Sequence, residues 1–409
     1  MDELKTNDSV IFELIQSEEQ RIENTIDLVA SENHMPKSIL EEMGSVLNHK
    51  TIEGYPGKRY HAGCEYVDVI ENLAIDRIKD LFEAEHANVQ PHTGSAANFA
   101  VYFSVLDVGD KVLAMSLAHG GHLTHGHFAS MTSKCFDFQH YNVDLDTQLI
   151  DYDALADHAI QFQPKMLVAG ASSYPRLIDY ERMFQIAKSV GAYLFVDMAH
   201  IAGLVAARLI PSPVHYADFV SFTTFKTMMG GRGGVILCKQ QYADDVDRSV
   251  FPGTQGTSSV SNIAAKATIA KLAKEDNFIN IQRQTIESAK LLADSLEKKG
   301  YRIVGGGTDT HQVIIDVTSK GVTGARAESV LESIGIITNR NFIPKDKGNK
   351  ASGIRLGTGP ISVRGISNIY VVEISEIIDT ALMNLDNNEL LDGLKSKVLS
   401  ICKKFPVYK

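Results

Sequence analysis

A lysine, an aspartate and a histidine follow apolar runs in the middle of the chain. The run from Ala192 to Met198 is rich in strand formers, and Asp197 and His200 lie at its end. A second run, from 218 to 224, is followed at once by Lys226. Such runs predict buried strands, with polar side chains where the strands end. Four glycines and a third apolar run come next: Gly230, Gly231, Gly233, Gly234 and residues 235–238.

Lys226 stands on an expected turn between two buried strands, where lysine is rare unless it is paired. A desolvated lysine loses its proton more easily and becomes an amine nucleophile that can form a Schiff base. Pyridoxal phosphate (PLP) requires such a lysine and an acidic partner for its ring nitrogen. Asp197 suits that partner, because a carboxylate beside the nitrogen keeps it protonated and able to absorb electrons. An ordinary surface lysine after a strand is the alternative that this stretch leaves open.

Several segments, in order along nearly the whole chain, resemble the serine hydroxymethyltransferase family. V-D-M-A-H-I-A-G-L-V-A-A (196–207) precedes T-T-F-K-T (223–227) and R-G-G (232–234). The resemblance implies a PLP-dependent transferase of fold type I, the aspartate aminotransferase-like α/β fold, moving a one-carbon unit between tetrahydrofolate and a small amino acid. The other matching segments are L-V-A-S-E-N (28–33), E-G-Y-P-G-K-R-Y (53–60), A-G-C-E-Y-V-D (62–68), N-V-Q-P-H-T-G-S (88–95), L-A-H-G-G-H-L-T-H-G (117–126), F-P-G-T-Q-G (251–256) and S-G-I-R-L-G-T (352–358).

The alternation of strand-like and helical stretches predicts a parallel or mixed sheet with helices on both faces. Active sites in such sheets collect at the carboxyl ends of the strands, so Ser172, Asp197, His200 and Lys226 are expected on one rim. A chain of 409 residues is too long for one simple core. We expect an N-terminal arm (1–24), a large PLP-binding domain (25–276) and a smaller C-terminal α+β domain (277–409).

The composition is that of a globular protein, and its net charge of −10 disfavours nucleic acid as a partner. No apolar run approaches the length needed to cross a bilayer. The first residues, M-D-E-L-K-T-N-D, lack the basic and apolar regions of a signal peptide. A reduced, cytoplasmic setting is expected, because the four cysteines are scattered without metal-ligand spacing. They are Cys64, Cys135, Cys238 and Cys402.

Thr93-Gly94-Ser95 opens an apolar helix, and such a turn favours an anion such as phosphate, because helix N-termini present N–H groups. Threonine or serine also begins many helices simply as a cap. The histidines near His122 are not expected to bind a metal, since no cysteine or paired carboxylate completes a ligand set. The resemblance stacks His122 on the PLP ring. It implies cofactor contacts from Thr93, Gly94, Ser95, His122, Ser172, Asp197, His200, Thr223, Lys226 and Gly256.

The glycine-rich segment 51–64 reads by composition as a surface loop. The resemblance instead carries it across a homodimer interface into the partner's active site, where Glu53 would handle protons of the substrate hydroxyl. Thr51 and His61 depart from the family, which has tyrosines lining the substrate pocket there. The smaller Thr51 leaves room beside the amino acid's α-carbon. An α-methyl pair, α-methylserine and D-alanine, is therefore a hypothesis beside the ordinary pair of serine and glycine.

Arg355 lies in a strand-like run and could be a solvated strand arginine. By resemblance it holds the substrate carboxylate through two parallel hydrogen bonds, which suits guanidinium geometry. Ser31 and His200 would lie beside that carboxylate. Phe225 replaces the family's usual histidine, which removes a polar contact on the phosphate side. The resemblance places folate against Leu117, Gly121, Leu123 and Asn341.

Residues 65–82 predict an amphipathic helix with its apolar residues at helical spacing. The predicted core positions are Val69, Ile70, Leu73, Ala74, Ile78 and Leu81.

Two rival functions remain at this stage. A folate-independent PLP aldolase or transaldolase would act on β-hydroxy amino acids, but the retained Glu53 and Asn341 argue against it. A non-catalytic protein on an enzyme scaffold is the other, and the intact set of Asp197, Lys226 and Arg355 argues against it.

Overall fold

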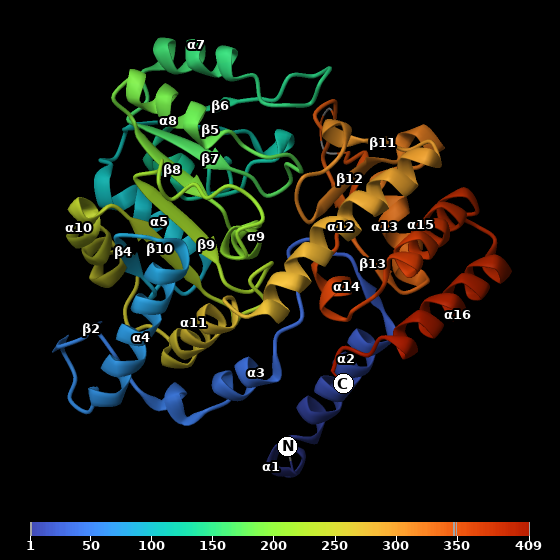
Figure 1. Ribbon diagram of the computed structural model, residues 1–409, viewed down its shortest axis with the longest axis horizontal. Helices are drawn as coiled ribbons and strands as arrows, with labels where there is room; N and C mark the ends of the chain where they lie inside the picture. The colour runs from blue at the N-terminus through green and yellow to red at the C-terminus, as the bar shows by residue number, and fades with distance from the viewer. Residues whose placement is uncertain (1, 347, 349, 409) are drawn as a thin grey trace. The chain divides into compact units, whose positions relative to one another are not determined.

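The chain forms two compact units in a computed structural model that describes residues 2–346, 348 and 350–408 (Figure 1). The larger unit comprises residues 35–283 and 343–345, and the smaller comprises 1–34, 284–342 and 346–409. The expected division into an arm (1–24), a large domain (25–276) and a small domain (277–409) stays a prediction. Residues 1, 347, 349 and 409 of that division lie outside the described residues.

The larger unit is built on a mixed seven-stranded sheet with the order β4-β10-β9-β8-β7-β5-β6. Neighbours from β6 to β9 pair in parallel, whereas β10 runs antiparallel to both β9 and β4. The α/β fold class is thus confirmed, together with the three strands expected between residues 192 and 238. The strands are β4 (His86–Asn88), β5 (Lys111–Met115), β6 (Asp137–Tyr141), β7 (Met166–Gly170), β8 (Tyr193–Asp197), β9 (Phe219–Thr223) and β10 (Gly234–Cys238).

Helices cover this sheet, which is why its central strands read as continuous apolar runs. Alternate residues such as Val112, Phe195 and Ile236 enter one core with α5 and α10, while α8 packs against β7 and β8. A two-stranded hairpin, β2 (Gly54–Tyr55) and β3 (Lys58–Arg59), lies in the predicted loop 51–64. The helices are α3 (Lys37–Met43), α4 (Glu65–Phe82), α5 (Gly94–Val105), α6 (Thr132–Cys135), α7 (Tyr152–Phe162), α8 (Tyr180–Ser189), α9 (Ala202–Ala206), α10 (Ala243–Arg248) and α11 (Val260–Leu272).

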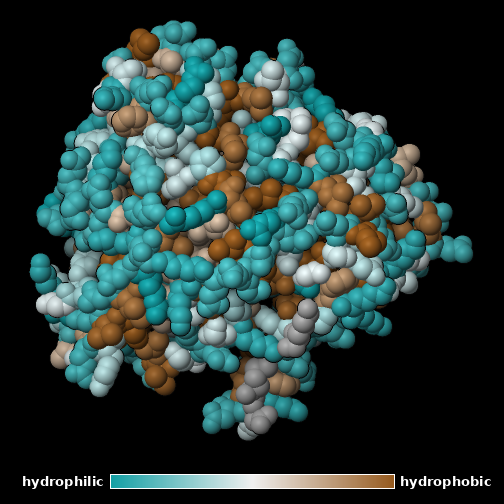
Figure 2. Space-filling view, viewed as in Figure 1, coloured by the Kyte–Doolittle hydropathy of each residue, from teal (hydrophilic) through white to brown (hydrophobic). Residues whose placement is uncertain are grey.

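Helix α4 buries part of the predicted stripe, since Ala74, Ile78 and Leu81 lie in the core as expected and Ile70 is half-buried. Val69 is 64% exposed and Leu73 is 41% exposed, so their assignment to the core is wrong. The helix turns Glu71 inward instead, because this carboxylate meets Arg59 at 2.5 Å and is paired when buried. Figure 2 shows hydrophobic side chains gathered on the surface over α4. The buried residues of the helix are Val67, Glu71, Ala74, Ile78, Leu81 and Phe82.

The smaller unit is built on a four-stranded antiparallel sheet with the order β11-β12-β15-β14. A separate parallel pair joins β1 to β13. The strands are β1 (Ile26–Asp27), β11 (Arg302–Ile303), β12 (Gln312–Asp316), β13 (Ile336–Ile337), β14 (Asn339–Asn341) and β15 (Gly353–Gly357). The helices are α1 (Asp2–Asn7), α2 (Ser9–Asn24), α12 (Asp276–Lys298, which enters from the larger unit), α13 (Gly324–Ser333), α14 (Gly359–Val363), α15 (Asn368–Met383) and α16 (Asn388–Lys404).

Candidate active site

Ser172, Asp197, His200 and Lys226, expected from the sequence on one rim, line a single cavity of about 190 Å³ in the larger unit. They follow or end the neighbouring strands β7, β8 and β9, and the N-terminus of α5 also contributes to the lining. The cavity thus lies where the carboxyl ends of parallel strands meet, as expected for this class of sheet. Its lining is Thr93, Gly94, Ser95, Asn98, His122, Ala171, Ser172, Asp197, Ala199, His200, Thr223, Phe225, Lys226 and Arg232.

A tight loop after β9 holds Lys226 at the cavity with 8% of the residue exposed. The Met229 N–H donates to the Lys226 carbonyl at 2.9 Å, and the Gly230 N–H donates to the Thr224 carbonyl at 2.6 Å. The Thr224 hydroxyl closes the loop by donating to the Gly231 carbonyl at 2.6 Å. These bonds fix the backbone from which the lysine side chain reaches the cavity.

Asp197 is the buried acid of the cavity. The Asn98 amide donates to its Oδ2 at 2.8 Å, and the His125 Nε2 lies 3.4 Å from the same oxygen. Burial alone would raise the pKa of Asp197, but the nearby His125 and the hydrogen bond from the Asn98 amide lower that pKa well below its usual range. The carboxylate is therefore ionised throughout the physiological range, as a partner for a protonated ring nitrogen must be.

His122 presents a neutral imidazole to the cavity. Burial lowers the pKa of His122 to about 4, and its Nδ1 lies 2.7 Å from the Thr124 hydroxyl. A neutral, half-buried ring suits stacking on a planar ligand. His122, His125 and Asp197 also offer atoms within 4.8 Å of one another that could ligate a metal. The expectation that these histidines bind no metal stays a prediction.

The N-terminus of α5 forms the other end of the cavity. The Thr93 hydroxyl accepts from the Ala96 N–H at 3.0 Å, so the threonine caps the helix. A Cβ on Gly94 would lie 2.5 Å from the Thr223 Cγ2, so glycine alone allows β9 to approach this turn. Backbone N–H groups of a first helical turn favour an anion. The turn therefore has the chemistry of a phosphate site.

Phe225, which takes the place of a histidine in the family, stacks against Arg232. The guanidinium carbon lies 4.5 Å from the centroid of the phenyl ring, within the range of a cation–π contact. Both side chains line the cavity. The loss of a polar group at Phe225 is thus accompanied by an aromatic face that holds a cation beside the cofactor pocket.

Other predicted residues of the larger unit lie outside this lining, as far as the described residues show. Thr51 and His61 are exposed, and Glu53 is half-buried with its Oε1 4.0 Å from the Cβ position of Gly256. The resemblance gives the loop 51–64 to a second subunit, and that role stays a prediction. So do the folate contacts, for which Leu117 is half-buried, Gly121 is buried and Leu123 is half exposed.

The smaller unit carries the residues predicted to meet the substrate carboxylate and the pterin. Arg355 is buried on β15, and its Nε donates to the Asn339 Oδ1 at 3.1 Å. Burial lowers the pKa of Arg355 to about 10, which leaves the guanidinium charged at neutral pH. Asn341 on β14 donates to the Phe342 carbonyl at 2.6 Å, and Ser31 is half-buried in the segment after β1.

Two residues that contact the Asp197 carboxylate, Asn98 and His125, were not predicted from the sequence. Asn98 fixes Asp197 from one side, and its own Oδ1 accepts from the Ser221 hydroxyl at 2.5 Å. The ring of His125 is held from behind, since its Nδ1 lies 2.8 Å from the Tyr102 hydroxyl. The available signal was a single asparagine inside the otherwise apolar helix that begins at Gly94, since a buried amide requires partners.

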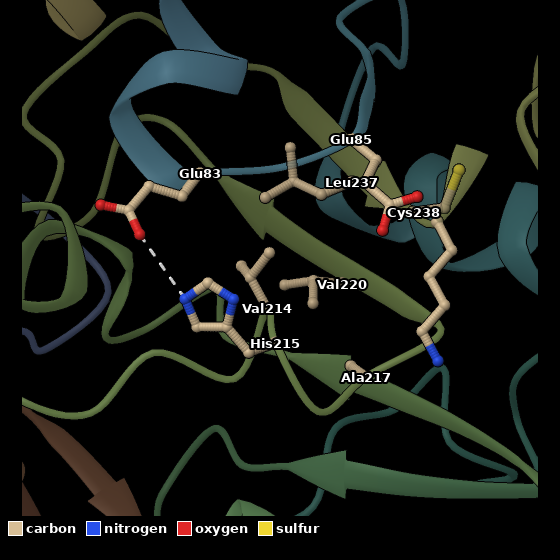
Figure 3. Close-up of a pocket in the computed structure, with 9 residues that line it drawn as sticks. Glu83, Glu85, Val214, His215, Ala217, Val220, Leu237 and Cys238 are labelled. Atoms are coloured by element: carbon tan, nitrogen blue, oxygen red, sulfur yellow. Dashed lines mark ion pairs between the residues drawn. The ribbon is translucent and has the colours of Figure 1, made fainter.

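A second hollow, of about 120 Å³, lies between the end of α4 and strands β9 and β10 (Figure 3). His215 faces Glu83 at 3.6 Å there, and Lys239 is paired with Asp218 at 2.7 Å. Burial raises the pKa of the Cys238 thiol to about 12, so this sulfur stays protonated and is a poor nucleophile. The hollow thus offers paired charges and an inert thiol, and it is no rival to the cavity at Lys226.

The residues of the cavity fit PLP by their donor set: a phosphate-type turn, an ionised buried acid, a neutral imidazole and a lysine. Among the helices of the described residues, none combines the length and apolar character that a bilayer crossing requires. A family model described as serine hydroxymethyltransferase matches residues 4–378, nearly the whole of the 409-residue chain.

Proposed function

Because the chain belongs to the serine hydroxymethyltransferase family, we propose that it moves a hydroxymethyl group between tetrahydrofolate and an α-methyl amino acid. The enzyme is a PLP-dependent hydroxymethyltransferase, and tetrahydrofolate is its one-carbon carrier. In the direction of synthesis, D-alanine, methylenetetrahydrofolate and water would give α-methylserine and tetrahydrofolate. The ordinary pair of serine and glycine is the alternative within the same reaction class.

PLP, when bound, supplies an electron-accepting ring that weakens a bond at the α-carbon of the amino acid. Lys226 would hold it through the amine, and Asp197 would keep a proton on its ring nitrogen. The turn at Thr93 and Gly94 would receive the phosphate, with Arg232 beside it. His122 would lie against the ring, and the shared placement of all these residues on one cavity supports the assignment.

Further contacts are proposed from Ser95, Ser172, His200 and Thr223, which line the same cavity. Arg355 would bind the substrate carboxylate, helped by Ser31 and His200. Each charge-assisted hydrogen bond of Arg355 would contribute about 1.5–3 kcal/mol. Leu117, Gly121, Leu123 and Asn341 would meet the folate.

The substrate proposal depends on the loop 51–64. Thr51 and His61 are exposed within their own chain, where the family has two tyrosines. Threonine is far smaller than tyrosine, and it leaves space for one extra methyl group on the α-carbon. In the proposed homodimer, or a tetramer made from it, this loop and Gly256 would complete the partner's active site. Glu53 would then exchange a proton with the substrate hydroxyl.

Initial rates with glycine and with D-alanine as acceptors, each with methylenetetrahydrofolate, test the substrate proposal. We expect D-alanine to have the higher kcat/KM. A strong preference for glycine would exclude the α-methyl pair and leave the ordinary reaction. L-Alanine is the matched control, because it carries the same methyl group with the opposite configuration at the α-carbon.

Omission of folate separates this reaction from the folate-independent aldolase. Turnover of α-methylserine or threonine-like substrates at an unchanged rate without tetrahydrofolate would favour the aldolase.

We also propose a cytoplasmic setting, since all four cysteines are unpaired in the described chain.

A further inference from the structure

Lys266 is a second buried lysine, on the face of helix α11 (Val260–Leu272) that is turned to the protein interior. It is 1% exposed, and its ammonium donates to the carbonyls of Val89 at 2.6 Å and Pro91 at 3.1 Å. Burial of an amine this deep is unfavourable unless its donors are satisfied. Lys266 thus ties α11 to the segment that leads directly into the anion turn at Thr93.

The Pro91 carbonyl joins this segment to the loop of Lys226. It accepts the Lys266 ammonium and also the Gly234 N–H at 3.0 Å. Gly234 ends the loop that begins after β9, so one carbonyl oxygen receives a donor from α11 and another from β10. The two walls of the cavity, the turn at Thr93 and the loop of Lys226, meet at this oxygen.

Helix α11 also supports the loop by direct packing. A Cβ on Gly233 would lie 2.4 Å from the Lys266 Cε, and a Cβ on Gly230 would lie 2.8 Å from the Ile269 Cγ2. Glycine at these positions lets the loop lie flat on the helix. The aliphatic part of the Lys266 side chain therefore packs against Gly233, while its ammonium binds the carbonyls of Val89 and Pro91.

The tied segment is held from the other side as well. The Gln90 amide donates to the Glu71 Oε1 at 2.7 Å, and the Gln90 carbonyl accepts from the Ser258 hydroxyl at 2.6 Å. Glu71 is engaged by Arg59, and both hydrogen bonds of Lys266 go to backbone carbonyls. Removal of the ammonium would release one side of the segment while the other side stays anchored.

We propose that Lys266 is a positioning residue for the cofactor, which sets the spacing between the anion turn at Thr93 and the amine of Lys226. This proposal rests on the assignment of the cavity to PLP. Lys266 does not line the cavity in the described residues and acts through the Pro91 carbonyl and Gly233. A change at Lys266 thus shifts both walls of the pocket without removal of any group that touches the cofactor.

The test compares K266M, which keeps the stem and removes the ammonium, with two controls on the same helix. K271M removes an exposed lysine, and I263A removes buried apolar volume. We expect the Kd for PLP to rise about 10-fold in K266M, as for the loss of the two hydrogen bonds from the Lys266 amine to the Val89 and Pro91 carbonyls. We also expect a changed visible circular dichroism band at saturating PLP, because this band reports how the ring is oriented. Neither control should change the band, although I263A lowers the melting temperature.

An unchanged Kd and an unchanged band in K266M would overturn the proposal, as would equal changes in I263A. If K266M does not fold, G233A tests the same contact from the loop side and should weaken PLP binding about as strongly. Borohydride reduction of the wild-type holoenzyme keeps the two assignments apart. A label at a residue other than Lys226 would overturn the site itself, whereas a label at Lys226 with an unaffected K266M overturns only this inference.

Discussion

The cavity at Lys226 and the loop 51–64 differ in burial. Asp197 and Lys226 are each 8% exposed, whereas Thr51 and His61 are exposed. In the proposed function, the buried cavity would carry the reaction class and the loop would select the amino acid. Changes in one region should therefore leave the property of the other intact.

The largest expected effect follows from Lys226→Ala. Turnover should fall by more than about 10⁴-fold, because both cofactor attachment and amine chemistry are lost. The measurement is single-turnover kinetics with PLP in excess. Lys271→Ala, on an exposed face of α11, is the control and should keep full activity. Turnover by K226A within tenfold of the wild type would break the assignment of the buried cavity.

Arg355→Leu should raise the KM for the amino acid by about 100-fold or more, because two charge-assisted hydrogen bonds to the carboxylate are lost. PLP binding should be unchanged, since Arg355 belongs to the smaller unit and the cavity lining to the larger one. Arg340→Leu, an exposed arginine on neighbouring β14, is the matched control. An equal rise in KM for both variants would refute a specific role of Arg355.

Thr51→Tyr tests the other half of the comparison. Restoration of the family's side chain should shift the ratio of kcat/KM for D-alanine over glycine toward glycine by about 10-fold or more, the value of a methyl group in a pocket. Absorbance of bound PLP should not change. A shift in PLP affinity without a shift in this ratio would show that the loop and the cavity are not separate in function.

The free energy of unfolding should depend on pH through the titration of Lys266. Burial lowers the pKa of Lys266 to about 7, although the charge of Glu71 acts in the opposite direction. Burial also lowers the pKa of His92, and the charge of Lys266 adds to that shift. Between about pH 7 and pH 10.4, the unfolded lysine holds a proton that the folded one lacks. The free energy of unfolding of the wild type should therefore rise with pH relative to K266M, by up to about 1.4 kcal/mol per pH unit. Urea titrations at several pH values measure this, and a flat difference would contradict it.

The smallest effect is expected from Phe225→Leu. Loss of the aromatic face against Arg232 should raise the Kd for PLP about 2- to 5-fold, in line with a partly exposed cation–π contact. Phe225→Tyr keeps the face and is the control. Equal values of Kd for the two variants would show that Arg232 is positioned without the ring.

The sequence predicted the strands and the rim well because buried parallel strands leave an unbroken apolar signal, as in residues 193–197. It failed where a polar partner outside the element decides the outcome. The burial of Glu71 on α4 was not predicted, because Arg59 pairs with it and the spacing of apolar residues cannot report such a pair. Asn98 and Lys266 were missed for the same reason, since the carboxylate and carbonyls that they meet are 99 and up to 177 residues away.

The Pro91 carbonyl has one consequence for the behaviour of the molecule. Both of its lone pairs are taken by donors from the protein, and proline brings no amide hydrogen that requires a partner. The carbonyl therefore offers no free lone pair to water, and the Gly234 amide is protected by the same oxygen that holds α11. We expect this amide to exchange slowly with solvent, on the timescale of wider opening of the larger unit.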